Sequence, residues 1–359
     1  MTKIISLFNH KGGVSKTTTT FHLGWKLAQL GQKVLIVDAD PQCNLTGLTL
    51  GIEDYDSLFK FYDSRQNNNI YTALAPTFGL SSGQIGYIEG IDTNATRHKN
   101  LFLMAGHIDF SKIDIQIATA LTSAGSLPIL KTFISAIYSL LEKTAKKSDF
   151  DIVLIDMSPS VSATNMCLLM GSDYFIIPTS PDFFCFQAIN SLASVLPSWS
   201  KQMMPFKTNG TLNKNNPKLL GIISQNYRAY GKESDEDQKK MAKSFDKWSQ
   251  KINEATNNVL VPSLQDNNMM IDRELFTKYV QYDTPFNLAS IQNFNSLIPV
   301  SQSHLKPMYE LKQEDYKGWN GSIWEREQNG KKVGAKINIE ECNIIYDQFS
   351  KSVLNLINA

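Results

Sequence analysis

The chain has 359 residues, of which 42% are hydrophobic and 19% charged, and its net charge is +1. That composition suits a globular protein with an apolar core, and the near-zero net charge excludes a nucleic-acid surface spread over the whole molecule. The four cysteines are scattered without a CxxC pair, which excludes a disulfide framework and a zinc site of the usual spacing. No apolar run reaches the roughly 18 residues of a membrane helix, and the first residues lack a signal-peptide pattern. We therefore expect a cytoplasmic protein.

The first fifty residues predict a strand, a glycine-containing turn, a helix and a second strand. The run KIISLF is apolar, and TTTTFHLGWKLAQLG then has its apolar residues at helical spacing and stops at Gly31. The run KVLIVDAD is almost entirely apolar up to its carboxylates. Continuous apolar strands separated by helices indicate a mainly parallel, twisted sheet with helices on both faces, the α/β class.

The rest of the chain continues this alternation with two interruptions. Residues 51–100 are polar and turn-rich, and predict a peripheral insertion with little regular structure. Residues 287–311 predict an apolar loop, and a polar stretch follows at 312–335. Further strands are predicted at NLFLMAGH, FDIVLIDMSPS, DYFIIPTS and KLLGIISQNY, and further helices at 127–147, 161–171, CFQAINSLASVLPSW, 234–256 and NIEECNIIYDQFSKSVLNLI.

No internal repeat or low-complexity linker divides the chain. We therefore predict one domain over residues 1–359, with the insertion at about 51–100 and a C-terminal extension at about 310–359. The last helix has an apolar face, and its polar face carries Glu340, Glu341 and Asp347 against Lys351. Anionic lipid would repel such a face, so we expect this helix to dock on the core and expect no membrane partner.

The stretch HKGGVSKTT has the residues of a phosphate-binding loop. Gly12 and Gly13 allow backbone N–H groups to approach phosphate oxygens, and Lys16 is spaced to reach the β and γ phosphates. The Thr17 hydroxyl is spaced to ligate Mg²⁺. The motif follows a predicted strand and opens a predicted helix, which is the context that it requires. We predict that ATP contacts Lys11, Gly12, Gly13, Val14, Ser15, Lys16, Thr17 and Thr18.

A second lysine, Lys11, stands where the ordinary G-x-x-x-x-G-K-[ST] pattern has its first glycine. An ammonium at the start of the loop cannot easily fold back onto the phosphates of its own loop. Its expected target is a phosphate bound by another subunit, where it would act like an arginine finger. Lys11 therefore predicts a homodimer that forms on ATP binding.

Carboxylates follow two of the predicted strands. Asp38 and Asp40 end one strand, at the edge where ligands bind in open α/β sheets. Either carboxylate is suited to orient the attacking water or to hold a water of Mg²⁺, and strand alternation does not rank the two. Asp156 follows four apolar residues, which is the Walker B pattern. The candidate metal-serving residues are Thr17, Asp38 and Asp156.

At these residues the chain resembles the ParA/MinD family of deviant Walker A ATPases, and the ParA branch in particular. The resemblance rests on NHKGGVSKTTTTFHLG, KVLIVDADPQCNLT, FDIVLIDMSPS and DYFIIPTSPDFFCFQAI, which cover about half of the chain. It implies a P-loop fold, Mg²⁺ and ATP as cofactors, ATP-dependent dimers and slow, partner-stimulated hydrolysis. Lys11 corresponds to the signature lysine, Lys16 to the Walker A lysine and Thr17 to the magnesium ligand.

The same resemblance assigns the other site residues. Asp40 corresponds to the aspartate that positions the hydrolytic water, and Asp156 to Walker B. Gln225 and Asn226 fall where relatives contact the adenine. The catalytic residues implied are Lys11, Lys16 and Asp40. The chain departs from the family pattern at two positions near the site. Ser15 replaces the usual glycine before the Walker A lysine, and Ser158 replaces the first proline of D-x-P-P.

Three classes of function compete for this chain. The first is a ParA-type ATPase that partitions or positions DNA or another cargo through an adaptor, with nucleoid association; a regulatory ATPase of another DNA-associated system is its runner-up. The second is a MinD-type membrane-cycling ATPase, which the acidic last helix disfavours. The third is a metabolic or redox relative of the same nucleotide fold. A redox relative would hold a metal cluster between paired cysteines, and the four scattered cysteines of this chain do not have that spacing.

One local feature bears on DNA. A basic stripe repeats every four residues along a predicted helix, and such a stripe can follow phosphates with sequence-independent affinity. The ordinary alternative is a solvated lysine face. The stripe consists of Lys239, Lys240, Lys243, Lys247 and Lys251.

Overall fold

The computed structural model describes residues 2–64, 68–79, 90–123, 130–208, 212–213, 215–227, 236–280, 284, 286–294, 296–317, 324–328 and 331–359. For residues 226–227, 236–244, 328 and 331–333 it describes the backbone alone.

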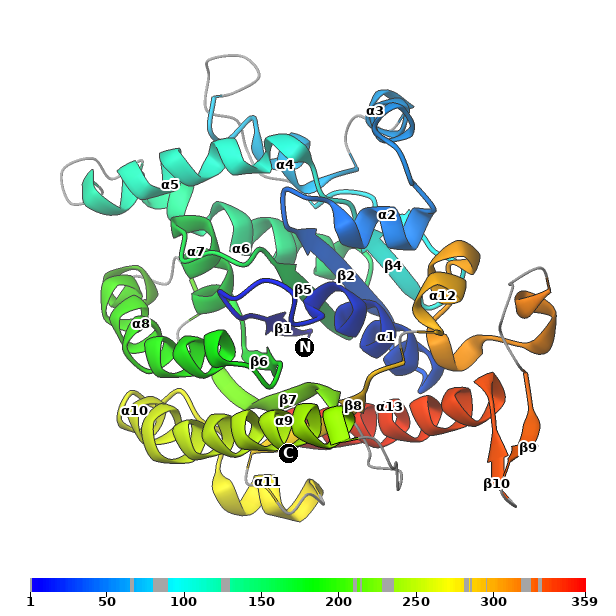
Figure 1. The fold of residues 1–359 in the computed structure, drawn as a ribbon. Helices are drawn as coiled ribbons and strands as arrows, with labels where there is room; N and C mark the ends of the chain where they lie inside the picture. Colours follow the sequence, from blue (N-terminus) through cyan, green and yellow to red (C-terminus); the bar gives the residue numbers. More distant parts are fainter. Residues whose placement is uncertain are drawn as a thin grey trace.

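Within the described residues, an eight-stranded sheet in the order β3-β4-β2-β5-β1-β6-β7-β8 forms the centre of the molecule (Figure 1). Every strand pair is parallel except β3 with β4, so the predicted α/β class is confirmed. The strands are β1 (Lys3–Leu7), β2 (Val34–Ala39), β3 (Asn94–Ala95), β4 (Leu101–Met104), β5 (Ile152–Met157), β6 (Tyr174–Thr179), β7 (Lys218–Tyr227) and β8 (Asn287–Gln292). A separate hairpin pairs β9 (Arg326–Gln328) with β10 (Lys331–Val333).

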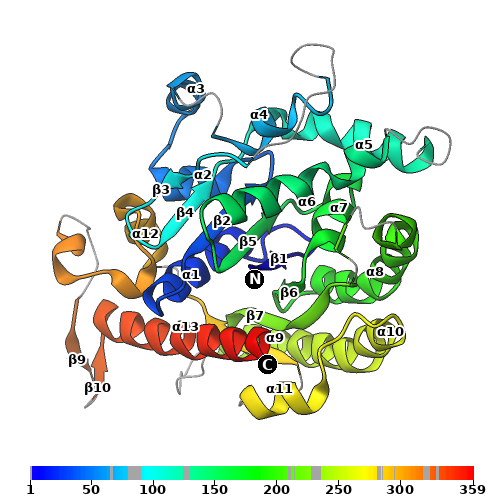
Figure 2. The ribbon, with the colours of Figure 1, turned by 180° about the vertical axis from the view of Figure 1, so that it is seen from behind.

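Helices cover both faces of the sheet (Figures 1 and 2). The first helix, α1, lies on one face together with the last helix, α13, whereas α5, α6, α7 and α8 pack against one another on the other face. The helices are α1 (Lys16–Gln29), α2 (Asn44–Leu50), α3 (Tyr55–Ser64), α4 (Ile70–Leu74), α5 (Ser111–Ser123), α6 (Leu130–Lys147), α7 (Ala163–Gly171), α8 (Phe183–Thr208), α9 (Glu236–Ala255), α10 (Val261–Asp266), α11 (Arg273–Tyr279), α12 (Ile298–His304) and α13 (Ala335–Asn358).

The central strands explain why the phosphate-binding loop is held firmly. All six residues of β2 and all six of β5 are buried, as the continuous apolar runs predict for a sheet covered on both faces. Helix α1 approaches β2 closely at Gly24, where an added Cβ would lie 2.7 Å from Cγ2 of Ile36. The helix that opens at the loop is thus fixed directly on the strand that carries Asp38.

The prediction of little regular structure in residues 51–100 is wrong for the described part, which contains α3, α4 and β3. Helix α3 buries Leu58 and Tyr62 against Cys43, and these contacts join residues far apart in the sequence. Helix α4 begins after Asn69, whose side chain accepts a hydrogen bond from the backbone N–H of Thr72. Residues 65–67 and 80–89 lie outside the described residues.

Of two further predictions, one is wrong and one is confirmed. Residues 287–311 contain β8, the edge strand beside β7, and α12, so the predicted apolar loop is wrong there. The predicted docking of the last helix is confirmed, because Cys342, Tyr346 and Phe349 of α13 are buried in the same cluster as β1. The division of the chain into one domain with peripheral additions stays a prediction. Among the described residues, no helix is long and apolar enough to cross a bilayer.

Candidate nucleotide-binding site

The loop between β1 and α1 is shaped by two residues with left-handed backbone conformations. Gly13 has φ 74° and Ser15 has φ 57°. Such turns direct successive backbone N–H groups toward one side and form a concave anion site. Asn9 anchors the start of the loop, since its Nδ2 donates to the carbonyl oxygen of Pro178 at 2.9 Å and its Oδ1 accepts the N–H of Lys11 at 3.0 Å.

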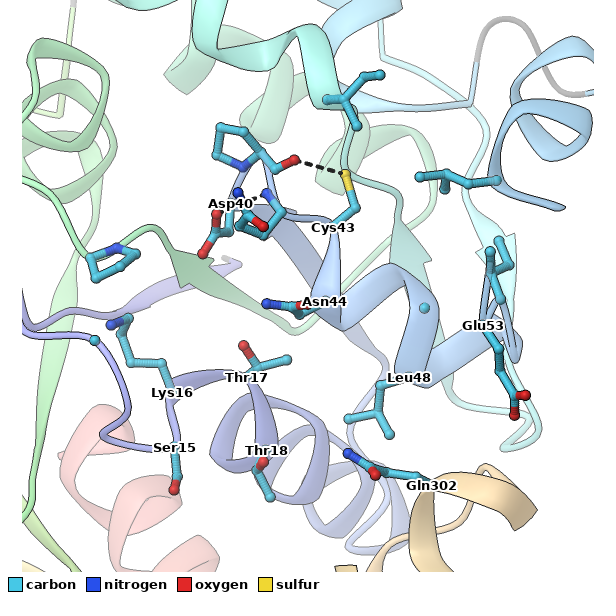
Figure 3. A pocket seen from close by; sticks show the side chains of 18 of the residues that line it. Ser15, Lys16, Thr17, Thr18, Asp40, Cys43, Asn44, Leu48, Glu53 and Gln302 are labelled. Atoms are coloured by element: carbon cyan, nitrogen blue, oxygen red, sulfur yellow. Dashed lines mark hydrogen bonds between the residues drawn. The ribbon is translucent and has the colours of Figure 1, made fainter. Parts of the chain in front are cut away.

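The loop forms one wall of a cleft of about 1240 Å³ (Figure 3). Loop residues Gly12–Thr18 line it, together with Asp40 and Asn44 at the end of β2 and the start of α2. The outer wall comes from α3 through Tyr55 and from α12 through Gln302. This volume exceeds the roughly 300–1,000 Å³ of common ligand pockets, so a nucleotide does not need to fill it.

Lys16 lies at the base of the loop and is 7% exposed. Its Nζ donates to the carbonyl oxygens of Asn9 at 3.0 Å and of Lys11 at 3.2 Å. Burial lowers the pKa of Lys16, and the nearby Asp156 carboxylate opposes that shift. The ammonium is therefore held within the loop by carbonyl acceptors and has no carboxylate partner within salt-bridge distance among the described residues.

Asp156 ends β5 beside Asp38, with which it pairs in register across the sheet. Its side chain is buried, and neither carboxylate oxygen meets the geometry of a hydrogen bond within the described residues, although the Thr17 hydroxyl is near enough to lower its pKa. Burial raises the pKa of Asp156 to about 8, the Asp38 charge adds to the rise, and the Thr17 hydroxyl and the Lys16 ammonium oppose it. An unpartnered buried carboxylate is costly, which marks this position as one where a cation or another donor is expected.

The site fits Mg²⁺ bound with a nucleotide better than a metal held by protein alone. No group of three or more metal-binding side chains forms a cage in the described part of the chain. Mg²⁺ typically uses one or two carboxylates and completes its shell with phosphate oxygens and waters. Asp156 and Thr17 supply oxygen ligands of that kind at the base of the loop.

The two aspartates that the sequence did not rank have different surroundings. Asp38 is fully buried, and its Oδ2 accepts the backbone N–H and the hydroxyl of Thr46, both at 2.7 Å. Burial raises the pKa of Asp38 to about 6. Strand β2 ends at Ala39, so strand alternation no longer applies to Asp40, which lines the cleft. Through Thr46, Asp38 fixes the start of α2, and its assignment as a metal-serving residue stays a prediction.

Of the two residues predicted to contact the base, Gln225 has a described side chain and Asn226 does not. Gln225 is 4% exposed, and its Nε2 donates to the Thr19 hydroxyl at 2.7 Å. That bond ties β7 to α1 and occupies the amide that the resemblance assigned to the base. The side chain of Asn226 lies outside the described residues, as do those of Lys239, Lys240 and Lys243. Those assignments stay predictions.

Lys11 does not line the cleft of its own chain. Its Nζ lies 2.5 Å from Oδ2 of Asp182, at the start of α8. Sequence analysis missed both Asp182 and Asn9 as residues that organise the loop. The signal for Asp182 was present, since an aspartate directly before an apolar helix is a common N-cap, and here its Oδ1 accepts the N–H of Cys185 at 2.9 Å.

Fold and loop together define a P-loop protein of the α/β class. The family model described as AAA domain matches residues 2–208, more than half of the chain. The chain belongs to this family, and within it to the ParA/MinD-type ATPases with a deviant Walker A loop.

Similar proteins of known sequence come from several bacteria. An uncharacterised protein of Mycobacterium tuberculosis is 29% identical over 204 residues, which is 56% of this chain and 54% of that protein. The sporulation initiation inhibitor protein Soj of Bacillus subtilis is 29% identical over 196 residues, 55% of this chain and 65% of Soj. The chromosome partitioning protein ParA of Caulobacter vibrioides is 26% identical over 192 residues, which is 53% of this chain and 60% of that protein. The chain thus spans between half and two thirds of the length of these curated relatives.

Two solved structures share the fold. A Corynebacterium diphtheriae protein superposes with a TM-score of 0.55 at 22% identity, over 74% of this chain and 99% of that one. A candidate plasmid partition protein of Borrelia burgdorferi, solved with bound AMPPNP, superposes with a TM-score of 0.52 at 16% identity, over 99% of both chains. At these identities the likeness concerns the fold alone.

Proposed function

We propose that this protein is a Mg²⁺·ATP-dependent ATPase switch that dimerises when ATP is bound and hydrolyses ATP slowly. The observation that carries the proposal is the separation of the two loop lysines. Lys16 is buried and lines the cleft, whereas the Lys11 ammonium pairs with Asp182, and neither Lys11 nor Asp182 lines the cleft. A lysine in the loop that does not line its own cleft is suited to a phosphate bound by a second copy.

The residues of one chain divide the work of binding. Backbone N–H groups of Gly12 and Gly13 and the positive end of α1 receive the phosphates, and Lys16 neutralises their charge. Thr17 and Asp156 would hold Mg²⁺, which supplies charge neutralisation at the β and γ phosphates. The buried, unpartnered Asp156 carboxylate supports this assignment. Asn226 remains the candidate for the base.

Hydrolysis in this proposal is a direct attack of water on the γ phosphorus, which gives ADP and phosphate without a covalent intermediate. Asp40 lines the cleft beside the loop, and in this proposal its carboxylate orients that water. Lys11 of the second copy adds a positive charge where negative charge develops in the transition state. Turnover is therefore coupled to dimer formation.

The biological role proposed is the partition or positioning of DNA or another cargo through an adaptor protein. The names of the relatives Soj and ParA support this role. Non-specific DNA binding through the lysines of α9 is part of the proposal, and of these Lys247 is exposed and Lys251 half-buried. Fluorescence anisotropy with a random duplex at low salt, with and without ATP, measures this binding. Absence of binding with ATP would remove DNA from the proposal.

Turnover at increasing protein concentration tests the switch itself. For the wild-type protein we expect the rate per molecule to rise with concentration, because catalysis needs two copies. Lys11→Ala should keep AMPPNP binding and lose that rise. A wild-type rate per molecule that does not change with concentration would show that Lys11 does not act in a dimer.

A further inference from the structure

Two exposed aromatic clusters, one among carboxylates and one with lysines over a ring, flank the phosphate-binding loop. The first, the α3 cluster, has Tyr55 and Phe59 one turn apart with their rings 5.4 Å from each other. Tyr55 is 64% and Phe59 45% exposed. Large aromatic side chains this exposed, grouped together, mark an interaction surface more often than an ordinary solvated face.

The charges around the α3 cluster are mainly negative. Four exposed carboxylates lie on α3 or just before it, with one exposed lysine, Lys60. Asp63 continues the stripe of Tyr55 and Phe59 by one more helical turn. The four carboxylates are Glu53, Asp54, Asp56 and Asp63.

The second group, the α8–α9 cluster, joins the start of α8 to the middle of α9. Phe183 and Phe184 are 44% and 66% exposed, and the Phe183 ring lies 5.5 Å from the ring of Trp248. Lys251 and Lys247 hold their ammonium groups 5.1 and 5.9 Å from the centre of the Trp248 ring. Amphipathic lysines over an aromatic face present a positive charge on an apolar base. Asp246 and Glu254 are exposed on the same helix and Asp182 directly precedes Phe183, so the cluster is mixed in charge, with its two lysines over the Trp248 ring.

Both clusters border the nucleotide site, from opposite sides. Tyr55 belongs to the wall of the cleft that the loop lines. Phe183 directly follows Asp182, which holds Lys11 of the same loop. In Figures 1 and 2, α3 lies at the top of the molecule and α9 at the bottom, with the loop that follows β1 between them.

From this arrangement we infer that the α3 cluster of one copy packs on the α8–α9 cluster of a second copy in the nucleotide-bound dimer. A two-fold axis can pass beside the loop, perpendicular to the line that joins the two clusters. Such an axis places the α3 cluster of each copy on the α8–α9 cluster of the other copy, so the contact forms twice. The carboxylates of α3 then face the two lysines over the Trp248 ring, and polar groups around an apolar centre are the usual composition of a specific interface. This inference rests on the proposed dimerisation and names the surfaces that accomplish it. It uses Lys247 and Lys251 for the dimer contact and leaves Lys239, Lys240 and Lys243 as the candidates for DNA.

Cysteine cross-linking between two differently tagged variants tests the contact. All four native cysteines are buried, so engineered surface cysteines react first. Tyr55→Cys in one chain and Phe184→Cys in the other, mixed with Mg²⁺ and AMPPNP, should give a cross-linked heterodimer, and little of it without nucleotide. The matched control pairs Tyr55→Cys with Ile344→Cys, which replaces a side chain 56% exposed on α13; we expect no product there.

Light scattering with AMPPNP separates failure of the contact from failure of the dimer. Tyr55→Ala and Phe184→Ala should each raise the dimer Kd by about tenfold, the size expected for an aromatic residue at the centre of an interface, and Ile344→Ala should leave it unchanged. A dimer of unaltered affinity in both variants, or equal cross-linking of the control pair, would overturn the inference while the proposed function stands. If the wild-type protein forms no dimer with AMPPNP, the proposed function itself fails.

Charge reversal adds an independent test. Lys247→Glu/Lys251→Glu in one chain should weaken the dimer, and Asp56→Lys/Asp63→Lys in its partner should restore at least part of the affinity. Two results together would overturn the inference and assign the α8–α9 cluster to DNA. The first is that a random DNA duplex protects Phe184→Cys from maleimide labelling without nucleotide, and the second is that the charge-reversed partner restores none of the dimer affinity.

Discussion

Lys11 and Asp182 form an ion pair of 2.5 Å between residues 171 positions apart in the sequence. The two side chains are 21% and 38% exposed, so solvent reaches both. The other oxygen of Asp182 accepts the N–H of Cys185, which fixes the carboxylate at the start of α8. In the free chain, the lysine proposed to act on a second copy is therefore bound to its own copy.

Asp182→Asn should release Lys11 and favour the dimer. Asparagine keeps an N-cap acceptor for the Cys185 N–H, so α8 should remain intact. Ion pairs of this exposure contribute about 0.2–1 kcal/mol each; since one pair is lost in each of the two copies, the dimer Kd should fall by at most about thirtyfold. Sedimentation with AMPPNP and turnover at low protein concentration measure the change.

The double variant Lys11→Ala/Asp182→Asn serves as the control for this prediction. It should behave as Lys11→Ala alone, because no lysine remains to be released. If Asp182→Asn leaves the dimer Kd unchanged, the ion pair does not compete with dimer formation.

The central fold and the loop could be predicted because their signals are local. The fully buried runs of β2 and β5 and the HKGGVSKT motif are each read within a few neighbouring residues. Helix α3 was missed because the residues that stabilise it lie elsewhere: Tyr62 contacts Cys43 and stacks 4.1 Å from the ring of His107. The edge strand β8 was missed because its partner in the sheet lies in another part of the sequence.

The ranking of site residues depended on tertiary geometry that no spacing contains. Asp38 and Asp40 became distinct only because β2 ends between them and Thr46 binds one of the two. The role of Asp182 depended on the position of β6 beside β1. Motifs therefore predicted which residue types line the cleft, whereas the different surroundings of each side chain required the three-dimensional structure.

Asp156→Asn should stabilise the protein without nucleotide at pH 8. The folded-state pKa of Asp156 is raised to about 8 from the ordinary 3.8. Stability from this group is therefore fully present below about pH 4, decreases as the pH rises, and is lost above about pH 8. The neutral amide removes the buried charge, and we expect a gain of about 1–3 kcal/mol at pH 8 that shrinks toward pH 5.

Urea unfolding at pH 5 and pH 8, with and without Mg²⁺·ATP, checks this prediction. Mg²⁺ should add to the stabilisation by ATP in the wild type and add little in the variant, because the carboxylate that would serve the metal is gone. A variant that is less stable at pH 8 than the wild type would contradict the unpartnered state of Asp156.

Substitutions at Asp40 and Asp38 should have opposite main effects. Asp40→Ala should lower turnover by at least about a hundredfold with AMPPNP affinity retained, because it removes the carboxylate that orients water. Asp38→Ala should instead lower the free energy of unfolding by about 1–3 kcal/mol, since it leaves the N–H and hydroxyl of Thr46 unpaired. Single-turnover kinetics and thermal unfolding of the same preparations distinguish the two. Equal losses of turnover per folded molecule would undo the ranking of the two aspartates.

Ser15→Gly should stabilise the phosphate-binding loop. Ser15 has φ 57° and ψ 31°, and its side chain makes no capping hydrogen bond. A left-handed conformation costs a residue with a Cβ about 1–2 kcal/mol, and the greater freedom of glycine in the unfolded chain offsets part of that gain. The net effect should be about 0.5–1 kcal/mol in favour of the variant, measured by urea unfolding, with ATP affinity retained.

Ser15→Ala separates the causes, because it removes the hydroxyl and keeps the strain. If Ser15→Ala and Ser15→Gly destabilise the protein equally, the hydroxyl matters and the backbone strain does not. If only Ser15→Gly raises the free energy of unfolding, the loop keeps the glycine geometry of its relatives despite the serine.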